Sequence, residues 1–308
     1  GKMEYLGGGM TGDAYLIEPK HACGTQYVVK LGKSDFLLQK YKSEASRLRY
    51  LSGAGGCPRL VAVCKDVPAF VTTFECKHTL ENFLANCGAR EAMEVFLKLA
   101  LAVKEVHDKG YIHNDIKPDN IIVSGSIGNY RVSIIDFGRA RRNGEVIETF
   151  ASPDPERFPH AAPEVADGQP CTPPADVYAM GKMYLDIRTK CDEVPQELET
   201  LAEQARQSDP LKRPSLLEII AQIQNIIKCL KPSKREVPDQ TKAKFWTEVP
   251  GQTKTKFRTE VHGQKKTKKT HSAVSNDIKP VSMVAEARRS AAEKSRARAR
   301  AWKRAGGS

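Results

Sequence analysis

The sequence lacks the features of membrane-spanning and secreted proteins. It has no run of 18 or more apolar residues, and its N-terminus has no charged stretch followed by an apolar run and a small-residue cleavage site. Its eight cysteines are scattered and form no C-x-x-C pair, which is typical of free thiols in a reducing compartment. We therefore expect an intracellular protein, cytoplasmic, nuclear or both, with no membrane span. A targeting signal ahead of Gly1 would not be visible in this sequence.

Large biases of composition are also absent. The chain has 308 residues, of which 40% are hydrophobic and 28% are charged, with 22 Gly and 18 Pro. These values lie near the average of globular proteins and exclude a collagen-like or wholly disordered chain. At roughly 150 residues per domain, the length predicts one large domain or two modest ones.

The basic residues are concentrated at the C-terminal end of the chain. Residues 231–308 contain 21 Lys and Arg against 7 Asp and Glu, so this tail carries +14 and residues 1–230 carry −2. The tail also has few large apolar side chains, and it could not bury enough surface to offset the entropy of ordering. We therefore predict a folded domain over residues 1–230 and a disordered basic tail over residues 231–280.

The tail contains a 12-residue repeat. VPDQTKAKFWTE, residues 237–248, is followed directly by VPGQTKTKFRTE, residues 249–260. Each copy has too few apolar residues for a packed repeat fold, which favours a polybasic array. Residues 281–305 have no Gly or Pro and are rich in Ala, Arg, Glu and Lys. We treat residues 281–308 as a basic, helical C-terminal segment that is marginally stable without a partner.

Two motifs near the N-terminus are weak when taken singly. Gly7, Gly9 and Gly12 form a G-x-G-x-x-G pattern between two strand-like runs, where backbone amides could approach phosphate oxygens. A plain hairpin turn is the commoner meaning of such a pattern. Lys30 ends an alternating strand, and Glu44 lies beside an apolar stripe of helical spacing, so the two side chains could form an ion pair.

The strongest motifs lie in the middle of the chain. YIHNDIKPDNIIV, residues 111–123, is followed by VSIIDFGRA, residues 132–140, and each apolar run delivers polar residues at its end. These motifs resemble the catalytic loop and the metal-binding motif of eukaryotic-type protein kinases. More landmarks of that family occur in order, namely Ala162-Pro163-Glu164, Asp176 and Arg213. The resemblance spans roughly residues 5–230, and the tail lies outside it.

The resemblance implies an α+β bilobal protein kinase fold. Residues 1–75 would form the N-lobe, a small antiparallel sheet with one helix. Residues 76–230 would form a larger, mainly helical C-lobe. In this family Asp176 would hold the backbone of the catalytic loop, and Arg213 would pair with Glu164.

The resemblance also implies an activity, the transfer of the γ-phosphate of ATP to serine or threonine hydroxyls of protein substrates, with Mg²⁺. Phosphoryl transfer requires positioned reactants, cations and one proton acceptor. By resemblance, Asp115 would accept the substrate proton and Lys117 would stabilise the transferring phosphate. Asn120 and Asp136 would bind Mg²⁺, an ion that prefers oxygen ligands. Lys117 in DIKPDN is more typical of serine/threonine kinases than of tyrosine kinases.

The resemblance assigns further residues to ATP. Lys30 would hold the α- and β-phosphates, with Glu44 keeping it in place, and Thr72 would be the gatekeeper in a connection between the lobes at residues 70–76. Val28 would help to sandwich the adenine ring, although ordinary strand core is an equal reading of such a residue. The predicted ATP-binding residues are Leu6, Gly7, Gly8, Gly9, Gly12, Ala14, Lys30, Glu44, Thr72, Glu75 and Cys76.

Several positions depart from the family pattern. Asn114 stands where many kinases carry an arginine that binds a phosphorylated activation loop, so we predict that loop phosphorylation is not the main switch. Arg157 replaces the usual threonine of serine/threonine kinases, and His160 replaces the tryptophan of tyrosine kinases. Tyrosine or dual specificity therefore stays open. The interval between Asp176 and Arg213 is short, which predicts trimmed substrate-docking helices.

Two other functions remain alternatives. The first is a pseudokinase scaffold, favoured by the missing arginine and the shortened lobe. The second is a protein that binds a nucleic acid or an acidic partner through its basic tail. Lys265, Lys266, Lys268 and Lys269 form a basic cluster compatible with nuclear import, but the tail has too few aromatic residues for a base-stacking platform. Small-molecule kinases of related fold fit less well, because the Ala-Pro-Glu and Arg213 landmarks are present.

Overall fold

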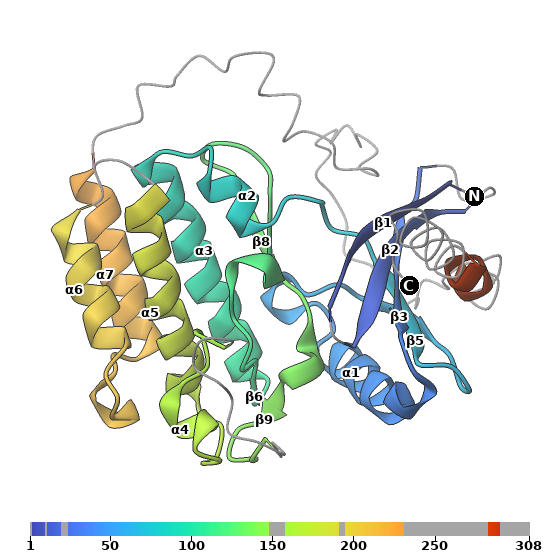
Figure 1. The fold of residues 1–308 in the computed structure, drawn as a ribbon. Helices are drawn as coiled ribbons and strands as arrows, with labels where there is room; N and C mark the ends of the chain where they lie inside the picture. The colour runs from blue at the N-terminus through green and yellow to red at the C-terminus, as the bar shows by residue number, and fades with distance from the viewer. Residues whose placement is uncertain are drawn as a thin grey trace, which may run out of the picture.

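The computed structural model describes residues 2–9, 11–19, 24–147, 158–190, 195–230 and 283–289. These residues form two lobes, a strand-rich lobe with one long helix and a mainly helical lobe (Figure 1). The predicted α+β bilobal architecture is therefore confirmed. None of the helices in the described ranges is long and apolar enough to cross a membrane. The 12-residue repeats, the Lys265–Lys269 cluster and Arg157 lie outside the described residues.

The N-lobe is built on an antiparallel sheet of five strands in the order β1-β2-β3-β5-β4. The glycine-rich turn joins the first two strands, and each strand pairs antiparallel with its neighbour. The strands are β1 (Lys2–Gly8), β2 (Gly12–Glu18), β3 (Tyr27–Gly32), β4 (Leu60–Val63) and β5 (Ala69–Thr73).

The two faces of this sheet are covered by different helices. On the inner face, Tyr41 and Leu48 of helix α1 (Leu38–Leu51) pack in one cluster with Phe70 of β5. On the outer face, residues 283–289 form a short helix that lies on the side of the sheet away from the helical lobe (Figure 1). The residues of this outer-face cluster are Tyr15, Ile17, Tyr27, Val29, Leu31, Ala69, Val71, Met283, Val284 and Ala287.

The connection between the lobes differs from the predicted one. Phe70 to Thr73 belong to strand β5, because Phe70 pairs with Lys30 and Thr72 with Val28 across the ladder to β3. Only residues 74–79 lie between β5 and the first helix of the C-lobe. The expected connection at residues 70–76 was therefore placed too early, since apolar residues that can complete a sheet do so.

The C-lobe packs its helices around α3 (Ala89–Asp108), whose apolar face is fully buried. Its other elements are α2 (Leu80–Leu84), β6 (Tyr111–Ile112), η3 (Pro118–Asn120), β7 (Ile121–Ser124), β8 (Arg131–Ile134), η4 (Phe137–Arg139), β9 (Arg141–Arg142), α4 (Pro163–Ala166), α5 (Pro173–Lys190), α6 (Gln196–Ala205), η5 (Pro210–Lys212) and α7 (Leu216–Cys229).

Local sequence signals explain where these helices begin. The carboxylate of Glu91 accepts a hydrogen bond from the backbone N–H of Gly88 at 3.0 Å, which satisfies a donor at the start of α3. Ser215 and Glu218 form a reciprocal capping box at the start of α7. Such caps stabilise a helix by about 1 kcal/mol, and they fix the first turn from which the buried faces of α3 and α7 extend.

Candidate active site

An ion cluster joins the two lobes at Lys30, which is half-buried between a buried Glu44 and a more exposed Asp136. Its Nζ donates to Glu44 Oε1 of α1 at 2.8 Å and to Asp136 Oδ1 at 2.8 Å. Lys30 reaches them because the alternation of β3 points Lys30 away from the outer-face residues Val29 and Leu31. The ion pair between Lys30 and Glu44 that the sequence predicts is therefore present. Asp136 joins them from the C-lobe, where its backbone is left-handed at φ 62° just before η4.

The charges in this cluster stabilise one another. Burial disfavours the charged form of Lys30, but the carboxylates of Glu44 and Asp136 outweigh burial and hold its pKa above the ordinary lysine value. Burial also disfavours the ionised form of Asp136, yet Lys30 keeps the pKa of Asp136 below its usual range. For Glu44, whose side chain is 4% exposed, burial wins and the pKa is raised. The site therefore holds an ammonium group beside an ionised aspartate.

The loop between β6 and η3 places three polar side chains together. Asn120 Nδ2 donates to the backbone oxygen and to Oδ2 of Asp115, both at 2.8 Å. Lys117 Nζ lies 3.2 Å from the same Oδ2 of Asp115. The carboxylate of Asp115 is thus held by two donors and stays half-buried, where a hydroxyl group of a substrate can approach it. Since the amide nitrogen of Asn120 is engaged, its Oδ1 is left to act as a ligand.

The side chain of Asp176 in α5 holds the backbone of this loop. Its carboxylate accepts hydrogen bonds from the N–H groups of His113 and Asn114, both at 2.8 Å, and lies 2.8 Å from His107 Nε2. Asn114 has a left-handed backbone at φ 61°, a conformation that asparagine tolerates better than most residues. The predicted role of Asp176 as a brace for the loop is confirmed.

The predicted ion pair between Arg213 and Glu164 is also present in the C-lobe. Arg213 donates from Nη1 and Nη2 to the two carboxylate oxygens of Glu164 at 2.6 and 2.7 Å. It also donates to the carbonyl oxygens of Pro174, Gln207 and Ser208. This bidentate pair links α4, the start of α5 and the segment before η5, as the sequence predicts.

The glycine-rich turn lies near Lys30, because the strand that follows it pairs with β3 and places Ala14 opposite Lys30. Gly9 N–H donates to the carbonyl of Gly12 at 2.9 Å, and Lys33 Nζ donates to the carbonyl of Gly9 at 2.6 Å. A Cβ at Gly12 would overlap the Tyr41 hydroxyl and the Leu31 carbonyl, so packing requires glycine there. A Cβ at Gly9 would meet nothing within 4 Å. The open space at Gly9 fits the approach of a phosphate to the backbone.

The remaining predicted ATP residues are distributed between strands and the interlobe connection. Leu6, Gly7 and Gly8 lie on β1, Ala14 lies on β2, and Thr72 lies buried near the end of β5. Glu75 follows β5, and its carboxylate accepts a hydrogen bond from the Thr73 hydroxyl at 2.9 Å. Cys76 Sγ accepts from the His78 N–H at 3.5 Å. Their assignment to ATP stays a prediction.

The donor set at the centre of the site fits a Mg²⁺-nucleotide complex. Asp136 offers an ionised carboxylate and Asn120 an amide oxygen, which are the hard oxygen ligands that Mg²⁺ prefers, with phosphate oxygens completing its shell. Lys30 places a cation beside Asp136 in the same site.

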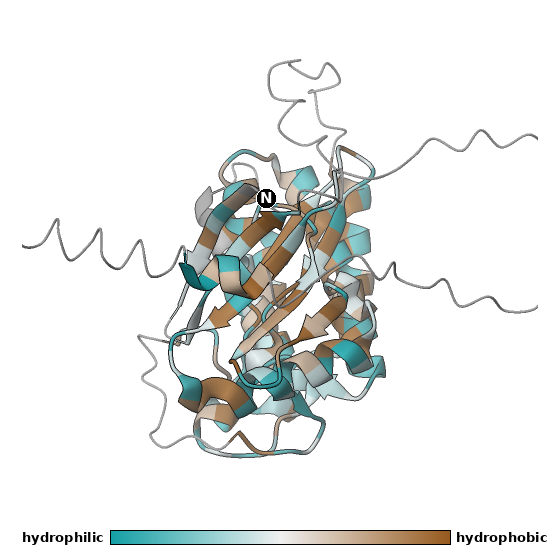
Figure 2. Ribbon diagram, turned by 90° about the vertical axis from the view of Figure 1, so that its right-hand side faces the viewer, coloured by the Kyte–Doolittle hydropathy of each residue, from teal (hydrophilic) through white to brown (hydrophobic). Residues whose placement is uncertain are grey.

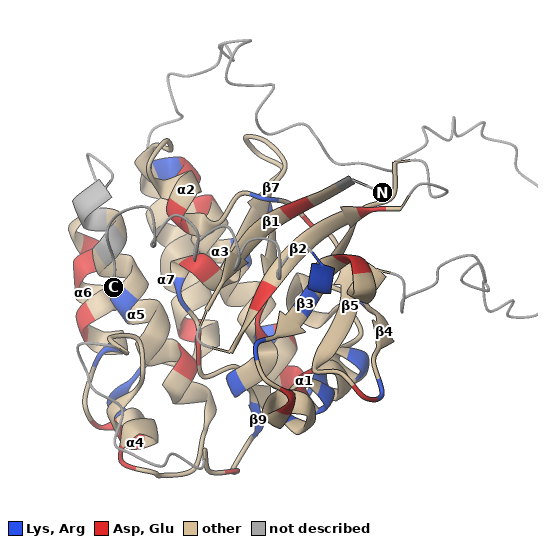
Figure 3. Cartoon of the chain, turned by 45° about the vertical axis from the view of Figure 1, so that its right-hand side comes forward, with Lys and Arg blue, Asp and Glu red and all other residues tan. Residues whose placement is uncertain are grey.

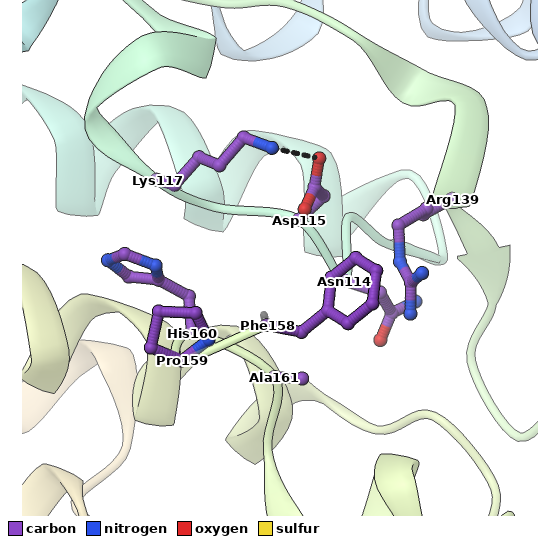
Figure 4. Close-up of a pocket in the computed structure, with 8 residues that line it drawn as sticks. All are labelled: Asn114, Asp115, Lys117, Arg139, Phe158, Pro159, His160 and Ala161. Carbon is purple, nitrogen blue, oxygen red and sulfur yellow. Dashed lines mark ion pairs between the residues drawn. The ribbon is translucent and has the colours of Figure 1, made fainter. Parts of the chain in front are cut away.

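A small pocket lies beside Asp115, between the catalytic loop and the segment that precedes α4 (Figure 4). The guanidinium of Arg139 lies over the ring of Phe158, with 5.5 Å to its centroid. The residues that line the pocket are Asn114, Asp115, Lys117, Arg139, Phe158, Pro159, His160 and Ala161. The pocket gives access to Asp115 from the side of the segment that precedes α4.

Arg47 is a residue of the site that no sequence motif marks. It lies one turn after Glu44 on the same face of α1, and its Nη1 donates to the carbonyl oxygens of Phe137 and Gly138 at 3.1 and 3.2 Å. These bonds tie α1 to the segment that carries Asp136. The spacing from Glu44 was a usable signal, because residues three apart on a helix are neighbours.

Comparison with known proteins agrees with this geometry. Residues 2–247 match the family described as the protein kinase domain, and the chain belongs to that family. Protein kinases use ATP and a divalent metal in general.

Three relatives illustrate the range of similarity. The chain is 22% identical to the membrane-associated tyrosine- and threonine-specific cdc2-inhibitory kinase of Drosophila melanogaster over 250 residues, 71% of this chain and 46% of that protein. It is 30% identical to serine/threonine-protein kinase PknK of Mycobacterium bovis over 161 residues, 49% of this chain and 14% of that protein. It is 27% identical to serine/threonine-protein kinase chk-1 of Caenorhabditis elegans over 203 residues, 61% of this chain and 39% of that protein. The chain thus spans less than half the length of these relatives.

Proposed function

We propose that this protein is an active, Mg²⁺-dependent kinase that transfers the γ-phosphate of ATP to serine or threonine hydroxyls of protein substrates. The observation that carries the proposal is the pair of bonds from Lys30 to Glu44 and Asp136, each at 2.8 Å. These bonds hold a lysine ammonium between carboxylates of the two lobes, at the place where the phosphates of ATP would bind. The intact trio of Asp115, Lys117 and Asn120 supports the same conclusion.

In the proposed reaction, the substrate hydroxyl enters beside Asp115 and attacks the γ-phosphorus in line with the leaving oxygen of ADP. One P–O bond forms and the bond to the β-γ bridging oxygen breaks, while Asp115 accepts the hydroxyl proton. Asn120 and Lys117 hold the carboxylate of Asp115 in position. Lys117 also neutralises charge on the transferring phosphoryl group, and Lys30 holds the phosphates that remain with ADP.

Asp136 and Asn120 would hold the metal ion. Mg²⁺ supplies neutralisation of phosphate charge when it is bound. The contribution of the protein is to keep Asp136 ionised, which the adjacent Lys30 does by lowering the pKa of Asp136 against the effect of burial.

The decisive test is transfer of labelled phosphate from ATP to mixed serine, threonine and tyrosine acceptors by wild type and by Asp115→Asn. We expect the variant to lose at least about a hundredfold in kcat, since general base catalysis typically contributes 10²–10⁴. Asp119→Asn is the matched control, because Asp119 is exposed on the same loop. Equal rates in wild type and Asp115→Asn would refute the proposal.

Phosphoamino-acid analysis of the same reactions tests the choice of hydroxyl. Lys117 supports serine and threonine, and the names of two of the relatives above do likewise. The name of the Drosophila relative includes tyrosine as well as threonine. Label in phosphotyrosine would therefore replace serine/threonine specificity by dual or tyrosine specificity.

The basic tail supports a second, separate activity, the binding of an acidic partner or a nucleic acid. Acidic and basic residues are interspersed over both lobes in the described part of the chain (Figure 3), and the excess of 14 positive charges belongs to residues 231–308. Binding through such charges falls steeply with salt. Retention on DNA or RNA at low salt that is lost at high salt would support nucleic-acid binding, and no retention on DNA, RNA or an acidic polypeptide would refute this activity.

The free thiols among the described cysteines favour an intracellular, reducing setting, cytoplasmic, nuclear or both.

A further inference from the structure

The outer face of the N-lobe sheet is strongly apolar. On β3, Tyr27, Val29 and Leu31 point to this face and are 8%, 0% and 6% exposed. Figure 2 views the sheet from this side and shows many residues of its strands as hydrophobic. A sheet that is apolar on both faces needs a covering layer on each, and α1 covers only the inner one.

Residues 283–289 supply the layer on the outer face. Met283, Val284 and Ala287 fall on one face of a helix and are 4%, 4% and 0% exposed within the outer-face cluster. Ala285 is exposed on the opposite side of the same helix. At one end, Arg288 Nη2 lies 3.6 Å from Asp35 Oδ1, an exposed ion pair that adds orientation more than stability.

A helix of this length does not persist in water without packing partners. Its apolar stripe and the apolar face of the sheet therefore order each other. We propose that residues 283–289 are a C-terminal latch, which binds in cis to the outer face of the N-lobe sheet and supports β3, the strand that carries Lys30. The basic tail would thus be anchored at both ends, at α7 and at the sheet.

The latch can influence the position of Lys30 because side chains alternate between the two faces along β3. Val29 and Leu31 contact the outer-face cluster, while Lys30 between them points to Glu44 and Asp136. Movement of Val29 and Leu31 after loss of the latch would shift the backbone of Lys30 as well. The latch therefore acts on the ATP site from the far side of the sheet.

The chain offers a matched pair of variants for the test. Ala287→Asp places a carboxylate in the buried interface, and Ala285→Asp places the same carboxylate on the exposed side of the same helix. Both variants make the same substitution and change the net charge equally, and they differ in the burial of the site and in its distance from the helix ends, since residue 285 lies in the first turn and residue 287 in the last. Val284→Asp is a second interface variant.

Cys64 is a native reporter of the docked state. It packs against the outer-face cluster, and burial raises the pKa of its thiol, with Arg288 of the latch opposing this effect. Alkylation of full-length protein by N-ethylmaleimide, followed by mass spectrometry of the Cys64 peptide, measures its exposure. Cys171, which is buried in the C-lobe, serves as an internal reference for global unfolding.

We expect Ala287→Asp and Val284→Asp to raise the alkylation rate of Cys64 about tenfold or more, with Cys171 unchanged and Ala285→Asp within about twofold of wild type. Equal Cys64 rates in the three variants and wild type would overturn the latch. Cys171 accelerating together with Cys64 would also overturn it, by showing that the variants unfold the domain and not the latch alone.

Measurements at different protein concentrations distinguish docking of the latch on the sheet of its own chain from docking on the sheet of a second copy. Residues 231–282 can span on the order of 170 Å when extended, so chain length permits docking on a second copy as well. Cis docking predicts that protection of Cys64 is independent of protein concentration over about a hundredfold range. Loss of protection on dilution would show docking between copies and would overturn the cis arrangement.

The link to the ATP site has its own readout. Titration with a fluorescent ATP analogue should give a Kd at least about threefold higher for Ala287→Asp than for Ala285→Asp. Equal affinities alongside an exposed Cys64 would overturn the support of β3. Failure of the wild type to bind the analogue would count against the proposed kinase function, whereas the Cys64 result would still decide the docking.

Discussion

At the scale of single residues, Asp176 shows how burial and hydrogen bonding compete. Its carboxylate has no solvent exposure and is bonded to two backbone N–H groups and His107. Burial alone would raise the pKa of Asp176, but the bonds from His107 and from the backbone amides outweigh it and hold the pKa below the usual aspartate value. The ionised carboxylate is therefore the form that holds the catalytic loop.

We expect Asp176→Asn to lower the free energy of unfolding by about 3 kcal/mol, because an amide NH₂ replaces an oxygen that accepts from buried donors. Urea unfolding at neutral pH measures this loss. Asp108→Asn is the control, since Asp108 is an exposed partner of Lys104, and we expect it to change stability by less than about 1 kcal/mol. A loss at Asp176 no larger than that at Asp108 would contradict the role of Asp176 as a brace.

The same residue predicts a pH dependence with a definite sign. A carboxyl group whose pKa is lower in the folded state stabilises the fold fully above the ordinary aspartate pKa of about 3.9, and loses this contribution as pH falls through the lower folded value. The difference in stability between wild type and Asp176→Asn should therefore be constant from pH 7 to about pH 5 and shrink below about pH 4. Urea unfolding at each pH checks this, and a difference that grows on acidification would reverse the sign.

At the scale of secondary-structure elements, helix α1 links the N-lobe sheet to the C-lobe. Its buried face packs on Phe70, Glu44 binds Lys30, and Arg47 binds the carbonyls of Phe137 and Gly138. The helix thus contacts both sides of the ion cluster and fixes their separation.

We expect Arg47→Ala to lower kcat/KM about tenfold, because the segment that carries Asp136 loses two charge-assisted hydrogen bonds to α1. Arg49→Ala, an exposed change on the same helix, should stay within about twofold of wild type. Steady-state kinetics with the best acceptor from the phosphotransfer assay measure both. A similar loss in the two variants would indicate a general effect on α1.

Much of this element could be predicted from the sequence. The helical spacing of its apolar residues placed Glu44 beside the buried face, and the predicted ion pair with Lys30 is present. The bonds of Arg47 to backbone carbonyls could not be predicted with the same ease, because a carbonyl group has no sequence signature. The early placement of the interlobe connection had a related cause, since pairing of Phe70 and Thr72 with β3 depends on a strand distant in the chain.

At the scale of the whole molecule, the candidate active site is an interface between the lobes. Lys30 comes from the sheet, whereas Asp136 comes from the C-lobe, and the two meet at 2.8 Å. A ligand that binds both of them adds a further link between lobes that are connected by residues 74–79 in the described chain.

We therefore expect ATP with Mg²⁺, at about a hundred times its Kd, to stabilise the fold by about 2.7 kcal/mol and to raise Tm by roughly 5–10 °C. In Asp136→Asn the shift with ATP should no longer depend on Mg²⁺, while Asp119→Asn should behave as wild type. Thermal unfolding followed by intrinsic fluorescence provides the measurement. A Mg²⁺-dependent shift that survives in Asp136→Asn would remove Asp136 from the metal site.

The sequence by itself determined the family and the two-lobed fold, because both follow from motifs of fixed spacing such as HNDIKPDN and DFG, and it predicted the ion pair of Lys30 with Glu44. Only the tertiary structure decided how Arg47 holds the segment of Asp136, and that residues 283–289 cover the outer face of the sheet. Charge and composition predict a boundary near residue 230 and a basic helical segment from residue 281, but they do not predict where that segment packs. Met283, Val284 and Ala287 are buried only because the folded sheet presents an apolar face to them. Burial depends on which residues lie opposite in space, and the local sequence does not contain that information.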